Sequence, residues 1–135
     1  MTRIWERLFV GSLQHAERLS RKNPNRISTV ICLCEQSVEH KAPNVRYIYL
    51  PVEDDEPVPL RQFDAIMQAI LVGISTGNVL LNCELGISRS PSIAAAYMHR
   101  VSYKHFDAAL AEIEQLRPII NPSHILLKSV KENLR

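Results

Sequence analysis

The stretch Asn82-Cys-Glu-Leu-Gly-Ile-Ser-Arg-Ser-Pro91 decides the fold of this chain of 135 residues. The apolar run 79–81 leads into it from a Gly77-Asn78 turn signal, and an alanine-rich pattern with helical spacing, residues 93–98, follows it. We therefore expect a buried strand, a tight loop and a helix in succession. Such a loop suits an anion, because its N–H groups and the positive end of the helix dipole face the same point.

Three side chains give this loop its chemical character. Cys83 ends the expected strand, where the helix field and a nearby cation favour a thiolate. Gly86 can adopt backbone angles closed to other residues, and Arg89 offers a planar fork that binds two phosphoryl oxygens at once. A cysteine six positions before an arginine is common by chance, so the inference depends on the whole combination. Together these features indicate a nucleophile for phosphoryl transfer.

Residues 83–90 fit the C-x5-R-S/T signature of the cysteine-dependent protein phosphatases, and the chain most resembles the small dual-specificity phosphatases. The resemblance implies a protein tyrosine phosphatase-like fold, phosphoprotein substrates and a phosphocysteine intermediate on Cys83. It also implies that Ser90 stabilises the departing thiolate, and that no metal or cofactor is required. The residues that would bind the substrate phosphate are Glu84, Leu85, Gly86, Ile87, Ser88 and Arg89.

An acidic segment between two prolines, residues 51–57, contains Glu53, Asp54, Asp55 and Glu56. Most such runs are solvated charge clusters. Phosphoryl transfer to a thiolate, however, needs an acid that protonates the leaving oxygen. The run 49–54 is similar to the family segment that carries this acid, and the resemblance places it at Asp54, with Asp55 as the alternative.

Asn82 stands where the family usually has a histidine immediately before the nucleophile. Asparagine offers similar donors and acceptors without a charge, so we expect weakened catalysis and a higher pH optimum. This departure leaves open a non-catalytic phospho-binding module. Two further hypotheses are a phosphatase acting on RNA 5′-phosphates or phosphoinositides, and a sulfur-transfer enzyme of the rhodanese type.

Cys32 and Cys34 lie in the β-branched run 27–34, on one face of the expected strand. Since no second Cys/His pair stands at zinc spacing, structural thiols are the default interpretation. In some members of the wider superfamily, a cysteine closing this strand forms a reversible disulfide with the nucleophile. The resemblance therefore suggests Cys34 as a redox partner of Cys83.

Composition predicts a single domain spanning residues 1–135 with a substantial core. The formal net charge of +2 argues against a dedicated nucleic-acid binder. No apolar run reaches the length of a membrane span, and the first residues lack a secretory apolar stretch. An odd number of cysteines, three, fits a reducing compartment, so we expect a cytoplasmic protein.

Strand and helix patterns alternate along the chain and end in consecutive helices, which favours an α/β class. We expect a mainly parallel central sheet of four or five strands, flanked by five or six helices. The crossover helix is predicted over 60–72, with Gly73 and Gly77 bounding its end. In the helix after the loop, Ile93, Tyr97 and Val101 are predicted to form the inner face.

Overall fold

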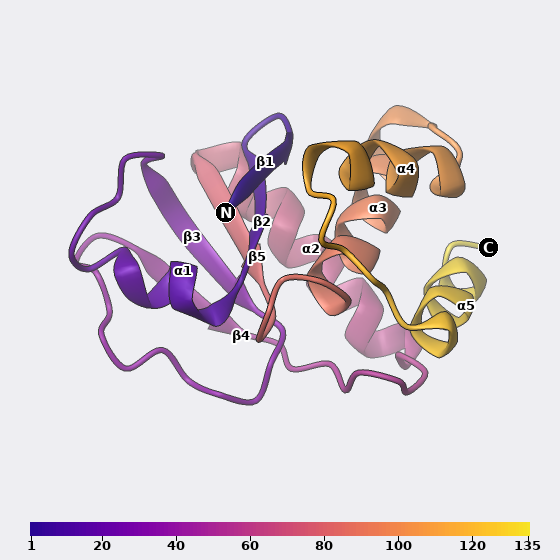
Figure 1. Ribbon diagram of the computed structural model, residues 1–135, viewed down its shortest axis with the longest axis horizontal. Helices are drawn as coiled ribbons and strands as arrows, with labels where there is room; N and C mark the ends of the chain where they lie inside the picture. The colour runs from indigo at the N-terminus through magenta and orange to yellow at the C-terminus, as the bar shows by residue number, and fades with distance from the viewer.

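The computed structural model describes residues 1–135 and contains one five-stranded sheet in the order β1-β2-β5-β3-β4 (Figure 1). The first two strands form an antiparallel hairpin, and all other pairings are parallel. This confirms the predicted α/β class and the mainly parallel sheet. The strands are β1 (Thr2–Trp5), β2 (Leu8–Gly11), β3 (Ile27–Cys32), β4 (Arg46–Tyr49) and β5 (Asn78–Asn82).

Five helices cover the two faces of the sheet (Figure 1). They are α1 (Leu13–Arg18), α2 (Leu60–Thr76), α3 (Arg89–Ser102), α4 (Phe106–Leu116) and α5 (His124–Asn133). The period-two alternation of β5 divides its side chains between two hydrophobic clusters. Val79 and Leu81 join the larger cluster with α2–α5, and Leu80 joins the smaller one with α1. None of the five helices combines the length and apolar character needed to span a membrane.

The central strand β5 lies between β2 and β3 and ends at Asn82, directly before the loop of interest. The helix that follows, α3, is buried on all sides over residues 89–98. A strand and a helix that are both enclosed by core side chains give the loop between them a fixed position. The carboxyl edge of the central strand is also where α/β folds place their sites.

Two predicted helix features differ from the structure. Helix α2 continues through Gly73 to Thr76, and Gly77 is its C-cap. Gly73 lies where the helix packs closely on the sheet, because a Cβ at this position would lie 2.8 Å from Val79. Val101 is 41% exposed and does not belong to the inner face of α3. Val101 lies in the last turn of α3 and, with Leu71 of α2, lines a surface hollow. Core side chains therefore no longer surround the helix at this position.

Candidate active site

Cys83 is 2% exposed and lies at the start of the phosphate loop, which we define as residues 83–89. Its N–H donates to the carbonyl of Gly11 at 3.4 Å, so β2 continues to support the chain beyond the end of β5. The N–H of Ser90 donates to Cys83 Sγ at 3.4 Å, and Ser90 Oγ lies 3.2 Å from the same sulfur. The N–H of Ser90 therefore donates to the sulfur, and the hydroxyl can also donate to it once the sulfur is ionised, an arrangement that stabilises a thiolate.

The N–H groups of residues 84–88 make no hydrogen bond within the chain, although the polypeptide is tightly curled there. Gly86 makes this curl possible with a φ of 71°, and a Cβ at this position would lie 2.6 Å from the backbone of Gly11. Unpaired N–H groups next to the N-terminus of α3 form an anion-binding nest. The loop is therefore built to hold an anion beside the sulfur of Cys83.

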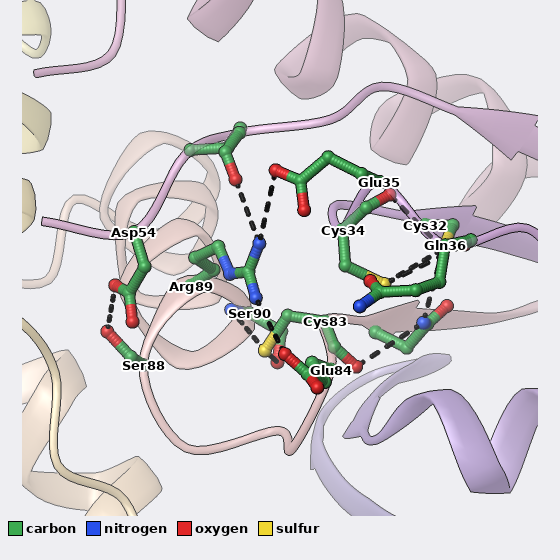
Figure 2. A network of polar contacts seen from close by, with 12 residues as sticks. Cys32, Cys34, Glu35, Gln36, Asp54, Cys83, Glu84, Ser88, Arg89 and Ser90 are labelled. Atoms are coloured by element: carbon green, nitrogen blue, oxygen red, sulfur yellow. Dashed lines mark hydrogen bonds and ion pairs between the residues drawn. The ribbon is translucent and has the colours of Figure 1, made fainter. Parts of the chain in front are cut away.

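Arg89 is the first residue of α3 and is 8% exposed. Its Nη1–H donates to the carbonyl of Val52 at 3.1 Å, which fixes the plane of the guanidinium. Carboxylate oxygens of Glu35 and Glu84 each lie 3.9 Å from this guanidinium (Figure 2). The Arg89 fork is thus already positioned by the protein, with its charge partly balanced by two acidic side chains.

Asp54 is tied to the phosphate loop by a hydrogen bond across 34 sequence positions: Ser88 Oγ donates to Asp54 Oδ1 at 2.8 Å. The Ser88 oxygen also accepts the N–H of Ser123 at 3.0 Å, so three segments meet there. Asp55 has a φ of 59° and makes no side-chain hydrogen bond or ion pair. Of the two candidate acids, Asp54 is the one that the structure brings to the loop.

Arg117 is a functional candidate that sequence reasoning missed. It is 8% exposed, and its Nε–H donates to the carbonyl of Gly86 at 2.8 Å, while a second nitrogen lies 3.5 Å from the carbonyl of Leu85. Burial lowers the pKa of Arg117, and the proximity of Cys83 opposes that shift. The guanidinium thus supports the phosphate loop from behind. The only signal in the sequence was a basic residue before Pro118, which indicates no more than a helix end.

Asn82 is fully buried behind the nucleophile. Its Nδ2–H donates to Cys32 Sγ at 3.4 Å and lies 3.5 Å from the carbonyl of Cys83, whereas its Oδ1 has no partner. Because Cys32 and Asn82 are register partners of β3 and β5, this contact follows from the sheet itself. Asn82 therefore links the base of the phosphate loop to the pair of thiols on β3.

Strand β3 ends at Cys32, so the prediction that it continues to Cys34 is wrong. The chain leaves the sheet after Cys32, yet the two sulfur atoms still lie 3.6 Å apart. The hydrogen bond between the thiols lowers the pKa of Cys32 and raises that of Cys34. Cys34 makes contacts with Cys32 and with the carbonyl of Gln36, and no hydrogen bond joins it to Cys83.

Comparison with known proteins adds independent information. A family model described as the catalytic domain of dual specificity phosphatases matches residues 8–134. The chain is 31% identical over 118 residues to dual specificity protein phosphatase 1-A of Xenopus laevis, covering 86% of this chain and 32% of that one. It therefore spans about a third of the length of that relative.

Solved structures share the fold. The crystal structure of human DUSP28 superposes with a TM-score of 0.86 at 22% identity, covering 99% of this chain and 95% of that one. A structure described as PTPMT1 in complex with PI(5)P superposes with a TM-score of 0.79 at 21% identity, covering 98% and 92% of the two chains. At these identities the likeness concerns the fold.

Proposed function

Because the chain belongs to the dual specificity phosphatase catalytic-domain family, we propose that it is a cysteine-dependent protein phosphatase acting on phosphotyrosine and on phosphoserine or phosphothreonine. One observation carries the proposal. The buried sulfur of Cys83 lies beside a loop whose five N–H groups, residues 84–88, are unpaired within the chain. A nucleophile next to a nest of unpaired donors fits phosphoryl transfer better than any structural role.

In the first step the substrate phosphate binds the loop N–H groups and Arg89. The sulfur of Cys83 attacks phosphorus in line, an S–P bond forms and the P–O bond to the substrate breaks. Asp54, oriented by its hydrogen bond from Ser88, gives its proton to the leaving oxygen. The products of this step are the dephosphorylated side chain and a phosphocysteine.

In the second step a water molecule attacks the phosphocysteine. The carboxylate of Asp54 accepts the proton of this water, the S–P bond breaks and inorganic phosphate leaves. The hydroxyl of Ser90, 3.2 Å from the sulfur, donates a hydrogen bond to the departing thiolate. Throughout, Arg89 and the loop amides face the charge that develops on the equatorial oxygens.

The non-catalytic alternative rests on Asn82, which replaces the usual histidine. Asn82 keeps a buried position behind Cys83 with a donor contact to the carbonyl of that residue. The nucleophile, the general acid and the anion-binding groups that we assign are all present in the chain. We therefore favour a working enzyme over a binding module, and the higher pH optimum stays a prediction.

The proposal also covers the extent of the domain and its location in the cell. We treat residues 1–135 as one catalytic domain, and we propose a cytoplasmic location because all three cysteines are free thiols. Since the chain spans only about a third of the curated relative named above, its physiological substrate is likewise part of the proposal.

A reversible disulfide between Cys34 and Cys83 also stays a prediction. The thiol in contact with Cys34 is that of Cys32, 3.6 Å away, so oxidation of this region has two routes. Peptide mapping after mild peroxide treatment separates them. A linked Cys34–Cys83 peptide supports the prediction, and its absence from oxidised, inactive protein contradicts it.

Turnover of a chromogenic aryl phosphate, inhibited by vanadate, tests the proposal most simply. We expect turnover by the wild type and none by Cys83→Ser, which should still bind phosphopeptides. Phosphotyrosine and phosphothreonine peptides then test dual specificity, and thiosulfate tests the sulfur-transfer alternative. Binding of phosphopeptides without turnover by the wild type would contradict the proposal in favour of a binding module.

A further inference from the structure

A hollow of about 390 Å³ lies between Glu35 and the acid loop, which we define as residues 51–57. Two of its lining residues also contact Arg89. Glu35 lies 3.9 Å from the guanidinium, and the carbonyl of Val52 accepts its Nη1–H at 3.1 Å. The hollow therefore adjoins the guanidinium of Arg89 on the side of Glu35 and Val52. Residues next to the phosphorylated side chain of a substrate would extend into it.

The ionisable lining of the hollow is entirely acidic. It consists of Glu35, Glu53 and Glu56, and no lysine or arginine lines the hollow. The side chain of Glu35 is 63% exposed, so it can turn toward a ligand at small cost. Glu84, 55% exposed, adds a carboxylate on the phosphate loop itself. Arg117 lies on the far side of the phosphate loop, against the carbonyl of Gly86. Around Arg89 itself, the carboxylates of the hollow and of Glu84 outnumber the one guanidinium.

The wall of the hollow is rigid, which distinguishes it from an ordinary solvated acidic run. Pro51, Pro57 and Pro59 fix the backbone around the glutamates. Val52 and Val58 are 2% and 3% exposed, and the N–H of Val58 donates to Ser129 Oγ at 2.7 Å, which pins the segment to α5. Carboxylates on a preorganised wall favour a cationic partner without a large ordering cost.

We propose that this hollow selects phosphopeptides with lysine or arginine next to the phosphorylated residue, and that it disfavours polyanionic substrates. The inference rests on the proposed phosphatase function and specifies its substrate class. A phosphoinositide headgroup or an RNA end brings further phosphates close to Glu35, Glu53 and Glu56. The Debye length is about 8 Å at physiological ionic strength, so salt screens the repulsion between charges closer than this only in part.

The test uses three phosphotyrosine peptides of one length, in which the flanking residues are arginine, glutamine or glutamate. Catalytic efficiency is measured for each peptide relative to an aryl phosphate, and affinity is measured with Cys83→Ser. An exposed ion pair changes affinity by roughly up to fivefold. With two or three pairs, we expect the arginine peptide to be favoured by about tenfold over the glutamate peptide.

In the variant Glu35→Gln/Glu53→Gln/Glu56→Gln we expect this preference to shrink to about twofold. The control Glu114→Gln, an exposed glutamate on α4, should keep it. High salt should weaken the preference of the wild type strongly and the small remaining preference of the triple variant only slightly. Equal use of the three peptides, or the same preference in the triple variant, would overturn the inference.

The affinities of Cys83→Ser separate this inference from the proposed function. If the wild type turns over no substrate, the catalytic proposal fails, and the relative affinities of the peptides still decide the charge preference. A phosphoinositide bound more tightly than the arginine peptide would contradict the inference while leaving phosphatase activity intact.

Discussion

The phosphate loop and the acid loop meet through one hydrogen bond, between Ser88 and Asp54, yet the protein holds them in opposite ways. The two reactive side chains of the phosphate loop are enclosed, because Cys83 and Arg89 are at most 8% exposed and Arg117 donates to the loop backbone at Gly86, although Glu84 and Leu85 of the same loop are exposed. In the acid loop, residues 53–56 are all exposed. The anion site is thus part of the core, whereas the acid is delivered from the surface.

This difference indicates a division of labour. Binding of the phosphoryl group depends on packing that is present before the substrate arrives. Delivery of the proton depends on an exposed segment that is held by its prolines and by the hydrogen bond from Ser88 to Asp54. Substitutions in the phosphate loop should therefore affect every substrate. Substitution of Asp54 in the acid loop should affect substrates according to their leaving group.

Apart from replacement of Cys83 itself, we expect the largest loss of activity for Arg89→Lys. Lysine keeps the charge but loses the fork, so kcat/KM should fall at least about a hundredfold for all substrates. The matched control is Arg100→Lys, which alters an exposed arginine on the same helix. Steady-state kinetics with aryl phosphate and phosphopeptide check the prediction, and equal activities of the two variants would contradict it.

The next effect distinguishes the two acidic residues. Asp54→Asn should lower kcat by roughly a hundredfold for alkyl phosphates, which have poor leaving groups, and much less for activated aryl phosphates. Asp55→Asn should leave both rates nearly unchanged, because the hydrogen bond from the phosphate loop goes to Asp54 and the side chain of Asp55 makes none. A strong, leaving-group-dependent loss in Asp55→Asn instead would move the general acid to position 55.

A smaller effect is expected for the support behind the phosphate loop. Arg117→Gln leaves the carbonyls of Gly86 and Leu85 without their donor, so the free energy of unfolding should fall by about 2 kcal/mol. Catalytic efficiency should fall roughly tenfold because the loop loses its fixed geometry. Denaturant unfolding and kinetics measure both quantities, with the exposed Arg21→Gln as control. Unchanged stability and activity would show that Arg117 has no supporting role.

We expect the smallest effect, a change in the pH dependence of stability, at the contact between the start of α1 and the phosphate loop. Ser12 and His15 form a capping box that begins α1, and the N–H of Leu13 donates to the carbonyl of Glu84 at 3.0 Å. Burial, with nearby positive charges, lowers the pKa of His15 to about 4. Its Nδ1 accepts the N–H of Ser12 at 2.9 Å, and protonation removes this bond.

Between pH 6.5 and about 4 the unfolded chain therefore binds more protons at position 15 than the folded chain does. Stability supplied by neutral His15 is present above this window and is lost as pH falls through it. His15→Gln, which can still cap the helix, should show a weaker fall in thermal stability over this range. His124→Gln is the control, and identical pH dependence in both variants would contradict the assignment.

The same contrast explains how much the sequence could predict. The phosphate loop follows local rules: a strand, a glycine with positive φ, an arginine and a helix stand in one continuous stretch, residues 78–102. The cap at Ser12 is equally local. Patterns of this kind fix the order of elements, and with the resemblance they predicted the fold; the roles of the site residues stay predictions.

What the sequence could not predict depends on contacts between distant segments. Arg117 reaches Gly86 across 31 positions, and Ser88 reaches Asp54 across 34. No local pattern contains such pairs. Packing against distant segments also decides two further features, the exposure of Val101 and the end of β3 at Cys32. The hollow lined by Glu35 likewise exists only in three dimensions.

The central claim is that the sulfur of Cys83 accepts the phosphoryl group. Asp54→Asn supplies the most direct test, because it should slow hydrolysis of the intermediate while still allowing attack on an activated aryl phosphate. Acid quenching followed by peptide mass spectrometry should then find one phosphoryl group on Cys83. Phosphate release with no phosphorylated Cys83, or turnover by Cys83→Ser, would contradict the account.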